Sequence, residues 1–379
     1  QMSVVSMKQL LEAGVHFGLA ACILSGKTTK LYNVPDIYDI KFTSDILKVL
    51  GCTVKRNKNK ITINSKQIKT HEIPDKLMRE MRSSVILAGA IIGRFKNAVF
   101  SYPGGCDIGS RPIDLHLQGF KKLGINIIEE SGFIKCMADK IVGAEIHLDF
   151  PSVGATENLM LASVLAEGET IIKNAAREPE IQDLQEMLNK MGANIEGAGT
   201  GIIRIKGVKT LKDVSYTIMP DRIEAGTLLC SIAITRGKGI IRNVIPEHIA
   251  PIIAKLEECG CKIQVNSDII KIESNNRLKG IEIKTMPYPG FPTDMQSVFG
   301  ALLTTAKGTS VIIENIFENR FKYINELKRM GAKATIEGKM AVIKGVRKLS
   351  NAEVNSTDLR GGAALILAGL FANRKNKSK

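Results

Sequence analysis

The sequence contains no tryptophan and only 12 Phe and 6 Tyr in 379 residues. Because hydrophobic residues still make up 44% of the chain, its cores must consist mainly of Ile, Leu, Val, Met and Ala. The chain also lacks an RNA-binding motif and interleaved aromatic residues, which argues against an RNA-binding protein. The length is sufficient for two domains of ordinary size.

Long apolar runs are also absent. No stretch approaches the roughly 20 apolar residues that a membrane-spanning helix needs. The first 18 residues contain no apolar segment typical of a signal peptide. We therefore expect a cytoplasmic protein that does not associate with a membrane.

The cysteines include no CxxC pair, which excludes the commonest zinc-binding and redox spacings. Their odd number and scattered positions fit a reducing compartment better than a disulfide scaffold. Cys259 and Cys261 lie at a predicted helix-to-strand junction without a nearby His, so we interpret them as structural residues. We expect neither a metal nor a cofactor. The seven cysteines are Cys22, Cys52, Cys106, Cys136, Cys230, Cys259 and Cys261.

Lys and Arg outnumber Asp and Glu by 53 to 38, which gives a net charge of +15. This charge would attract phosphates, nucleotides or nucleic acid. The alternative is that most of the lysines only solvate the surface. Composition alone does not separate these two interpretations.

A repeat of about 70 residues organises the chain. An amphipathic segment ending in Gly precedes β-branched residues in five places, for example in "GFKKLGINI" and "EMLNKMGANI". This pattern predicts a helix with a glycine C-cap, followed by strands. Two domains of three such α/β units would require six copies, and the sequence shows five, with the boundary expected near residues 215–220. The capping glycines are Gly51, Gly124, Gly192, Gly260 and Gly331.

A second predicted helix in each unit carries a polar residue near its start. Helix N-termini attract anions, so these residues could together form a phosphate-binding surface. The alternative for Asp221 is a simple N-cap. The five residues are Arg82, Ser152, Asp221, Asp294 and Asp358.

The segment "SYPGGCDIGSRPIDLH", residues 101–116, interrupts the repeat. Its glycines predict a loop that presents Cys106 to solvent, and Pro112 is expected to begin a helix. Arg111 would favour the thiolate and Asp107 the thiol. The sequence therefore leaves open whether Cys106 acts as a general acid or as a nucleophile.

This loop and six further motifs in order resemble the enolpyruvyl transferases that act on UDP-N-acetylglucosamine. The motifs are "PSVGATEN", "AAREPEI", "PDRIEAGT", "PGFPTDMQ", "ENIFENRF" and "STDLRGG". The resemblance implies two inside-out α/β barrel domains built from βαβαββ repeats, with the sixth repeat incomplete. It also implies transfer of the enolpyruvyl group of phosphoenolpyruvate to the 3′-hydroxyl of UDP-N-acetylglucosamine, which begins peptidoglycan synthesis. A monomer without nucleic acid partners is expected.

The resemblance implies a role for each matching residue. Cys106 would protonate phosphoenolpyruvate and be the site that fosfomycin alkylates, and Asp294 would be the base beside the sugar hydroxyl. Arg82, Arg111 and Arg360 would hold phosphate and carboxylate groups. The remaining substrate-binding residues implied are Pro112, Ile113, Asp114, Leu115, Ser152, Val153, Gly154, Ile316 and Arg320.

Both ends depart from the family. Residues 2–18 resemble a small-subunit ribosomal protein instead of the family's opening strand and Gly-Ala-Lys-Asn turn, and the closing His-Ile-Asp-Arg-Gly motif is absent. We therefore expect a foreign segment at 1–18, a first domain at 19–219 with its catalytic loop at 101–112, a second, incomplete domain at 220–370, and a basic tail at 371–379. The alternatives are an impaired remnant or fusion, the shikimate-pathway enolpyruvyl transferase, or a basic RNA-associated protein.

Overall fold

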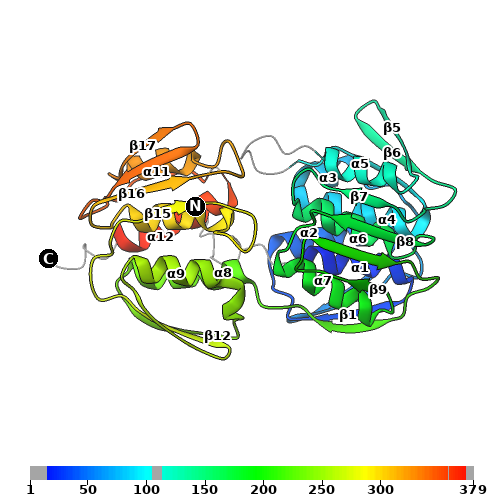
Figure 1. The fold of residues 1–379 in the computed structure, drawn as a ribbon, viewed down its shortest axis with the longest axis horizontal. Helices are drawn as coiled ribbons and strands as arrows, with labels where there is room; N and C mark the ends of the chain where they lie inside the picture. Colours follow the sequence, from blue (N-terminus) through cyan, green and yellow to red (C-terminus); the bar gives the residue numbers. More distant parts are fainter. Residues whose placement is uncertain (1–14, 105–112, 357, 373–379) are drawn as a thin grey trace. The chain divides into compact units, whose positions relative to one another are not determined.

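The computed structural model describes residues 15–104, 113–356 and 358–372. These form two compact units, which we call the N-terminal unit (described residues 15–104 and 113–219) and the C-terminal unit (described residues 220–356 and 358–372) (Figure 1). Among these residues, no helix is both long and apolar enough to cross a membrane.

The N-terminal unit contains three sheets and helices packed against them. Its sheets have the strand orders β11-β1-β3-β2, β7-β8-β10-β9 and β4-β6-β5. Its helices are α1 (Val15–Ser25), α2 (Tyr38–Leu50), α3 (Asp75–Glu80), η2 (Arg82–Val85), α4 (Ile86–Phe95), α5 (Asp114–Lys122), α6 (Val153–Ser163) and α7 (Pro179–Lys190). Its strands are β1 (Thr28–Tyr32), β2 (Thr53–Asn57), β3 (Lys60–Asn64), β4 (Asn97–Ser101), β5 (Asn126–Glu130), β6 (Phe133–Met137), β7 (Glu145–His147), β8 (Glu169–Lys173), β9 (Asn194–Glu196), β10 (Ile202–Lys206) and β11 (Val214–Thr217).

The C-terminal unit has two sheets among its described residues, in the orders β12-β14-β13 and β15-β16-β18-β17. Its helices are α8 (Arg222–Ile234), η3 (Pro246–Ile249), α9 (Ala250–Glu258), η4 (Thr293–Met295), α10 (Gln296–Leu303), α11 (Lys322–Arg329) and α12 (Leu359–Ala372). Its strands are β12 (Lys238–Arg242), β13 (Lys262–Asn266), β14 (Ile269–Glu273), β15 (Glu282–Lys284), β16 (Thr309–Ile313), β17 (Lys333–Glu337) and β18 (Met340–Lys344).

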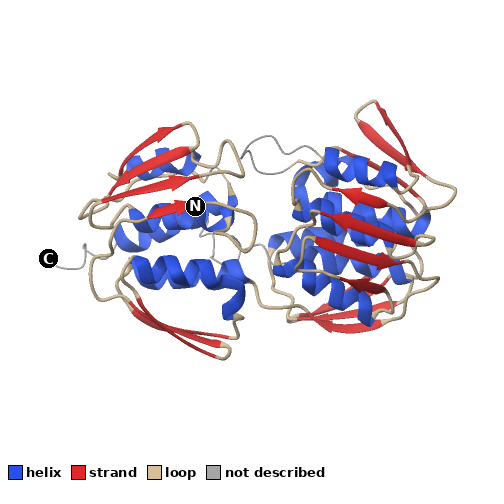
Figure 2. Ribbon diagram, viewed as in Figure 1, coloured by secondary structure: helices blue, strands red, loops and turns tan. Residues whose placement is uncertain are grey.

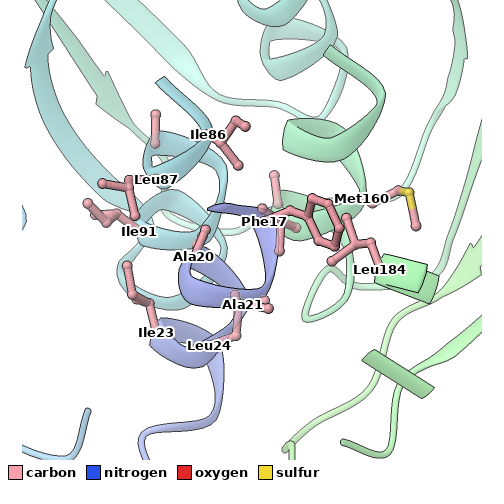
Figure 3. Close-up of a cluster of buried hydrophobic side chains, with 14 of the residues drawn as sticks. Phe17, Ala20, Ala21, Ile23, Leu24, Ile86, Leu87, Ile91, Met160 and Leu184 are labelled. Atoms are coloured by element: carbon pink, nitrogen blue, oxygen red, sulfur yellow. The ribbon is translucent and has the colours of Figure 1, made fainter. Parts of the chain in front are cut away.

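Each unit has buried helices at its centre and strands around them (Figure 2). Helices α1, α4 and α6 pack on one another in the N-terminal unit, and α8, α10 and α12 do so in the C-terminal unit. These six helices are apolar on most of their surface, as expected for helices buried on all sides. Figure 3 shows Ile23 of α1 on the side of Ile91 of α4, and Phe17 of α1 beside Met160 of α6 and Leu184 of α7. The inside-out α/β fold is therefore confirmed.

The five capping glycines all have left-handed backbone, with φ between 83° and 109°. Gly51, for example, follows α2 and donates its N–H to Lys48. A side chain at such a position is strained, which explains why glycine recurs there. The predicted repeat is thus present as a recurring helix end.

Asparagine side chains tie three strands to their parallel neighbours. Nδ2 of Asn33, after β1, donates to the carbonyl oxygen of Ile218 at 2.9 Å. Nδ2 of Asn174, after β8, makes the same contact with Leu148 at 2.7 Å. Nδ2 of Asn315, after β16, binds the carbonyl oxygen of Thr285 at 3.1 Å. Each acceptor follows a short strand, β11, β7 or β15, which leads toward the start of a central helix.

The N-terminal boundary expected after Gly18 lies inside α1, which is continuous from Val15 to Ser25. Val15, Phe17 and Leu19 are all buried in the core of the N-terminal unit. Residues 15–18 therefore belong to the packed fold. The six cysteines that the structure describes are free and buried, which agrees with the interpretation of Cys259 and Cys261 as structural residues.

The close approach of α4 and α6 depends on glycine. A Cβ atom added to Gly89 would overlap the main chain and side chain of Asn158. We expect Gly89→Ala to lower the free energy of unfolding by about 2–3 kcal/mol through overpacking. Gly369, in α12, has no atom within 4 Å of an added Cβ, so Gly369→Ala should instead raise it by about 0.5–1 kcal/mol. Urea unfolding of both variants checks this pair, and equal effects would contradict it.

Candidate active site

The start of α6 carries three of the predicted substrate-binding residues. Ser152 is the N-cap, and its hydroxyl accepts a hydrogen bond from the N–H of Ala155 at 3.3 Å. Val153 and Gly154 form the first turn, and within the described residues their N–H groups have no hydrogen-bonded acceptor. This helix start thus offers two main-chain donors and the positive end of the helix dipole to an anion.

His116 lies against this helix start. An added Cβ on Gly154 would lie 3.3 Å from Cε1 of His116 and 3.6 Å from its Nε2, so glycine leaves room for the ring. His116 is 5% exposed. Burial and, to a smaller extent, the nearby positive charge of Arg82 together lower its pKa from 6.5 to about 3. The ring is therefore neutral near pH 7.

The tautomer of His116 follows from its partner Asn158. The N–H of Gly89 donates to Oδ1 of Asn158 at 2.8 Å, which fixes the orientation of the amide. Nδ2 of Asn158 then donates to the Val85 carbonyl at 3.0 Å and to Nδ1 of His116 at 2.7 Å. Because Nδ1 accepts, the proton of the neutral ring is on Nε2. The helix start thus gains an imidazole N–H donor.

The residues that follow the predicted loop occupy the beginning of α5. Ile113 is the N-cap residue and is 1% exposed, whereas Asp114, in the first turn, is exposed. Leu115 is half-buried and packs against the core of the N-terminal unit. An acidic residue in the first turn of a helix is favoured by the helix dipole. Of these three residues, Asp114 and Leu115 have side-chain surface available to a ligand.

In the C-terminal unit, Asp294 is held by two buried arginines. Its Oδ1 lies 2.8 Å from a terminal nitrogen of Arg320 and 3.6 Å from Nε of Arg360. The side chains of the two arginines are 4% and 5% exposed, whereas that of Asp294 is 37% exposed. Two buried cations therefore orient a carboxylate that still reaches solvent.

Two other acidic residues at helix starts act as caps. Oδ1 of Asp221 accepts from the N–H groups of Ile223 and Glu224, which confirms the N-cap interpretation of this residue. Oδ1 of Asp358 accepts from the N–H groups of Arg360 and Gly361 at 3.1 and 3.0 Å. Asp358 thus fixes the backbone that carries Arg360.

The predicted site residues are distributed over both units. Cys106, Arg111 and Pro112 lie outside the described residues. Their roles, and those of the other predicted residues, remain predictions. The described residues hold no group of three or more His, Cys, Asp or Glu arranged for a metal ion. The N-terminal unit holds Arg82, Ile113, Asp114, Leu115, Ser152, Val153 and Gly154, and the C-terminal unit holds Asp294, Ile316, Arg320 and Arg360.

His116, Asn158 and Glu314 were not among the residues predicted from the sequence to form the site. All three occur in the motifs that carried the resemblance, as the last residue of "RPIDLH", the last of "PSVGATEN" and the first of "ENIFENRF". Their position in these motifs was the available signal. Their contacts join segments far apart in the sequence, such as residues 85, 116 and 158, and so were not evident from local patterns.

The depressed pKa of His116 predicts a pH-dependent stability. Between pH 6.5 and about 3 the unfolded chain binds a proton that folded His116 excludes. Stability from this residue is therefore present above pH 6.5 and is lost as pH falls, by up to about 1.4 kcal/mol per pH unit. We expect the stability difference between the unmodified chain and His116→Asn to shrink between about pH 7 and about pH 5.

Urea unfolding at the two pH values measures this difference. His147→Asn, at an exposed histidine of the same unit, is the matched control. A stability difference between the unmodified chain and His116→Asn that does not change with pH would contradict the lowered pKa of His116.

Comparison with known proteins identifies the family. The family model described as EPSP synthase (3-phosphoshikimate 1-carboxyvinyltransferase) matches residues 16–377. A UDP-N-acetylglucosamine 1-carboxyvinyltransferase 2 of Caldanaerobacter subterraneus subsp. tengcongensis is 54% identical over 355 residues, which cover 93% of this chain and 85% of that protein. The protein of that name from Clostridium tetani is 52% identical over 356 residues, with the same coverage of 93% and 85%.

Solved structures show the same fold at lower identity. The enolpyruvyl transferase NikO from Streptomyces tendae is similar with a TM-score of 0.83 and 22% identity, covering 94% of this chain and 86% of that one. An EPSP synthase from Acinetobacter baumannii has a TM-score of 0.69 and 18% identity, covering 94% and 87%.

The family match begins at residue 16, three residues before the expected start at Leu19. These matches give no support to the resemblance of residues 2–18 to a ribosomal protein. The relatives above 50% identity share one name, whereas the EPSP synthase structure is similar at 18%. The chain belongs to the EPSP synthase family of carboxyvinyltransferases and, within it, to the UDP-N-acetylglucosamine 1-carboxyvinyltransferases.

Proposed function

We propose that this chain transfers the enolpyruvyl group of phosphoenolpyruvate to the 3′-hydroxyl of UDP-N-acetylglucosamine and releases phosphate. The observation that carries the proposal is the 54% identity, over 93% of the chain, to a relative with this name. The arrangement of Asp294 between Arg320 and Arg360 supports it, because the reaction needs a base near bound anions. This step supplies the precursor of peptidoglycan.

The chemistry assigns a role to each candidate. Asp294 accepts the proton of the 3′-hydroxyl while the hydroxyl oxygen bonds to C2 of phosphoenolpyruvate. Cys106 gives a proton to the C3 methylene, which produces a tetrahedral intermediate with a methyl group. The Cys106 thiolate then takes back a methyl proton, and the C2–O bond to phosphate breaks as phosphate leaves with the proton held by Asp294, which restores the double bond and both side chains. Separate acid and base groups allow addition without a charged carbon intermediate.

The anion-binding groups have complementary roles in this proposal. Arg82, Arg111 and Arg360 hold phosphate and carboxylate oxygens, which arginine binds in a planar, bidentate geometry. The helix start at Ser152, Val153 and Gly154 takes part of the nucleotide. The N–H of His116 adds a neutral donor at that helix start. Pro112, Ile113, Asp114, Leu115, Ile316 and Arg320 line the rest of the site.

The proposal includes location and partners. Scattered, buried thiols support a cytoplasmic protein. The chain would act as a monomer without a nucleic acid partner, and the positive charge would serve to attract anionic substrates.

Phosphate release tests this proposal. The purified chain, incubated with both substrates, should release phosphate only when UDP-N-acetylglucosamine is present, and shikimate 3-phosphate should not replace the sugar nucleotide. Cys106→Ser and Asp294→Asn should each lower kcat by about 10²- to 10⁴-fold, as expected for a lost acid or base. Fosfomycin should label the unmodified chain but not Cys106→Ser. No release by the unmodified chain, or release with shikimate 3-phosphate instead, would refute the proposal.

A further inference from the structure

Glu314 is a buried carboxylate at the end of β16, in the C-terminal unit. The residue is only 1% exposed. Within the described part of the chain it forms no ion pair. Buried carboxylates usually have a cation or a full set of hydrogen bonds. Glu314 has the second arrangement.

The two carboxylate oxygens of Glu314 receive four hydrogen bonds. Oε1 accepts from the N–H groups of Ile316 and Phe317 at 2.8 and 3.2 Å and from the hydroxyl of Thr285 at 2.9 Å. Oε2 accepts from the hydroxyl of Thr293 at 3.0 Å. One side chain therefore joins its own loop, the residue after β15 and the first residue of η4.

These contacts close the loop 314–320 on the residues around Asp294. At one end of the loop, Glu314 binds Thr293, the residue immediately before Asp294. At the other end, Arg320 binds Asp294 itself at 2.8 Å. Ile316 lies between these two anchors and is held by its own N–H. The distance between Ile316 and Asp294 is thus set by two connections instead of one.

Thr285 adds a third support to the same loop. Its hydroxyl donates to Glu314 and accepts from the N–H of Asn315 at 2.9 Å. Its carbonyl accepts from the side chain of Asn315 at 3.1 Å. The main chain at the start of the loop is therefore fixed on both sides. Such a network holds a site in one geometry before a ligand binds.

We propose that Glu314 is a positioning residue that holds Ile316 and Asp294 at the relative position needed to bind the sugar nucleotide. The role rests on the proposed function, because Asp294 and Ile316 are assigned to base and sugar-nucleotide contact there. Glu314 itself does not touch substrate, since it is buried. It acts through Thr293 on Asp294 and through the main-chain N–H groups on Ile316.

The proposal gives Glu314 two effects, one on Asp294 and one on Ile316, and different variants can separate them. Glu314→Ala removes both the hydrogen bond to Thr293 and the hydrogen bonds from the N–H groups of Ile316 and Phe317. Thr293→Val removes only the hydroxyl that connects Glu314 to the neighbour of Asp294. Glu314→Gln keeps the shape of the side chain and an oxygen that accepts from the N–H groups. Its amide N–H can donate to the Thr293 hydroxyl. Thr305→Val, at a buried threonine of the same unit whose hydroxyl binds the Leu302 carbonyl, is the matched control.

Steady-state kinetics with phosphoenolpyruvate and UDP-N-acetylglucosamine provide the first readout. Glu314→Ala should lower kcat and raise KM for UDP-N-acetylglucosamine, each by about 10-fold or more, since small displacements of reacting groups are costly. Thr293→Val should lower kcat by about 10-fold and change that KM by less than about 3-fold. Glu314→Gln and Thr305→Val should keep both constants within about 3-fold of the unmodified chain.

Hydrogen exchange of the Ile316 and Phe317 amides provides a second readout that does not depend on activity. Glu314→Ala should speed exchange at both amides by about 10-fold or more, whereas Thr305→Val should leave them unchanged. Unchanged exchange in Glu314→Ala would overturn the proposal that Glu314 holds the loop 314–320. Equal kinetic losses in Glu314→Ala and Thr305→Val, or in Glu314→Gln and Glu314→Ala, would overturn the positioning role. If the unmodified chain releases no phosphate, the proposed function fails, and the exchange measurement alone decides whether Glu314 holds the loop 314–320.

Discussion

Burial of the central helices on all sides is the constraint on which each unit depends. In the N-terminal unit α1, α4 and α6 pack together, and residues such as Gly89 allow their main chains to approach. A helix surrounded by apolar neighbours has no face on which to display polar groups. Polar side chains that reach solvent can then appear only near its ends, and a polar side chain in its middle, such as Asn158 of α6, needs buried hydrogen-bond partners. This explains why Ser152, Asp221 and Asp358 all lie at the beginning of central helices, where they also satisfy main-chain N–H groups.

The strands position these helix starts through a repeated contact. A short parallel strand leads toward the start of a helix, and an asparagine on the neighbouring strand binds the carbonyl at its end, as Asn174 does with Leu148. The copy at Asn315 contains an additional feature, because the preceding residue is the buried Glu314. A structural tie common to three repeats is thereby extended in one of them to the residues around Asp294.

Much of the fold could be predicted from the sequence because its signals are local. Glycine after an amphipathic helix marks a left-handed C-cap, and Gly51 and Gly331 have that backbone. The N-cap role of Asp221 was likewise predicted from the sequence next to it. The grouping of Asp294 with Arg320 and Arg360 was implied only by resemblance to a family. This grouping brings together residues that are 26 or more positions apart in the sequence. The periodicity of the sequence does not reveal such contacts.

The two sets of candidate residues use different physical means to fix their geometry. Around His116 the network is neutral: an amide oriented by main-chain groups fixes the tautomer, and burial keeps the ring uncharged. Around Asp294 the network is ionic, with buried arginines against a partly exposed carboxylate. A neutral donor beside Arg82 adds no further repulsion between cations, whereas Arg320 and Arg360 need a nearby anion to be tolerated in the interior. Both networks are formed by groups of the protein itself, so under the proposed function little reorganisation would be required when substrate binds.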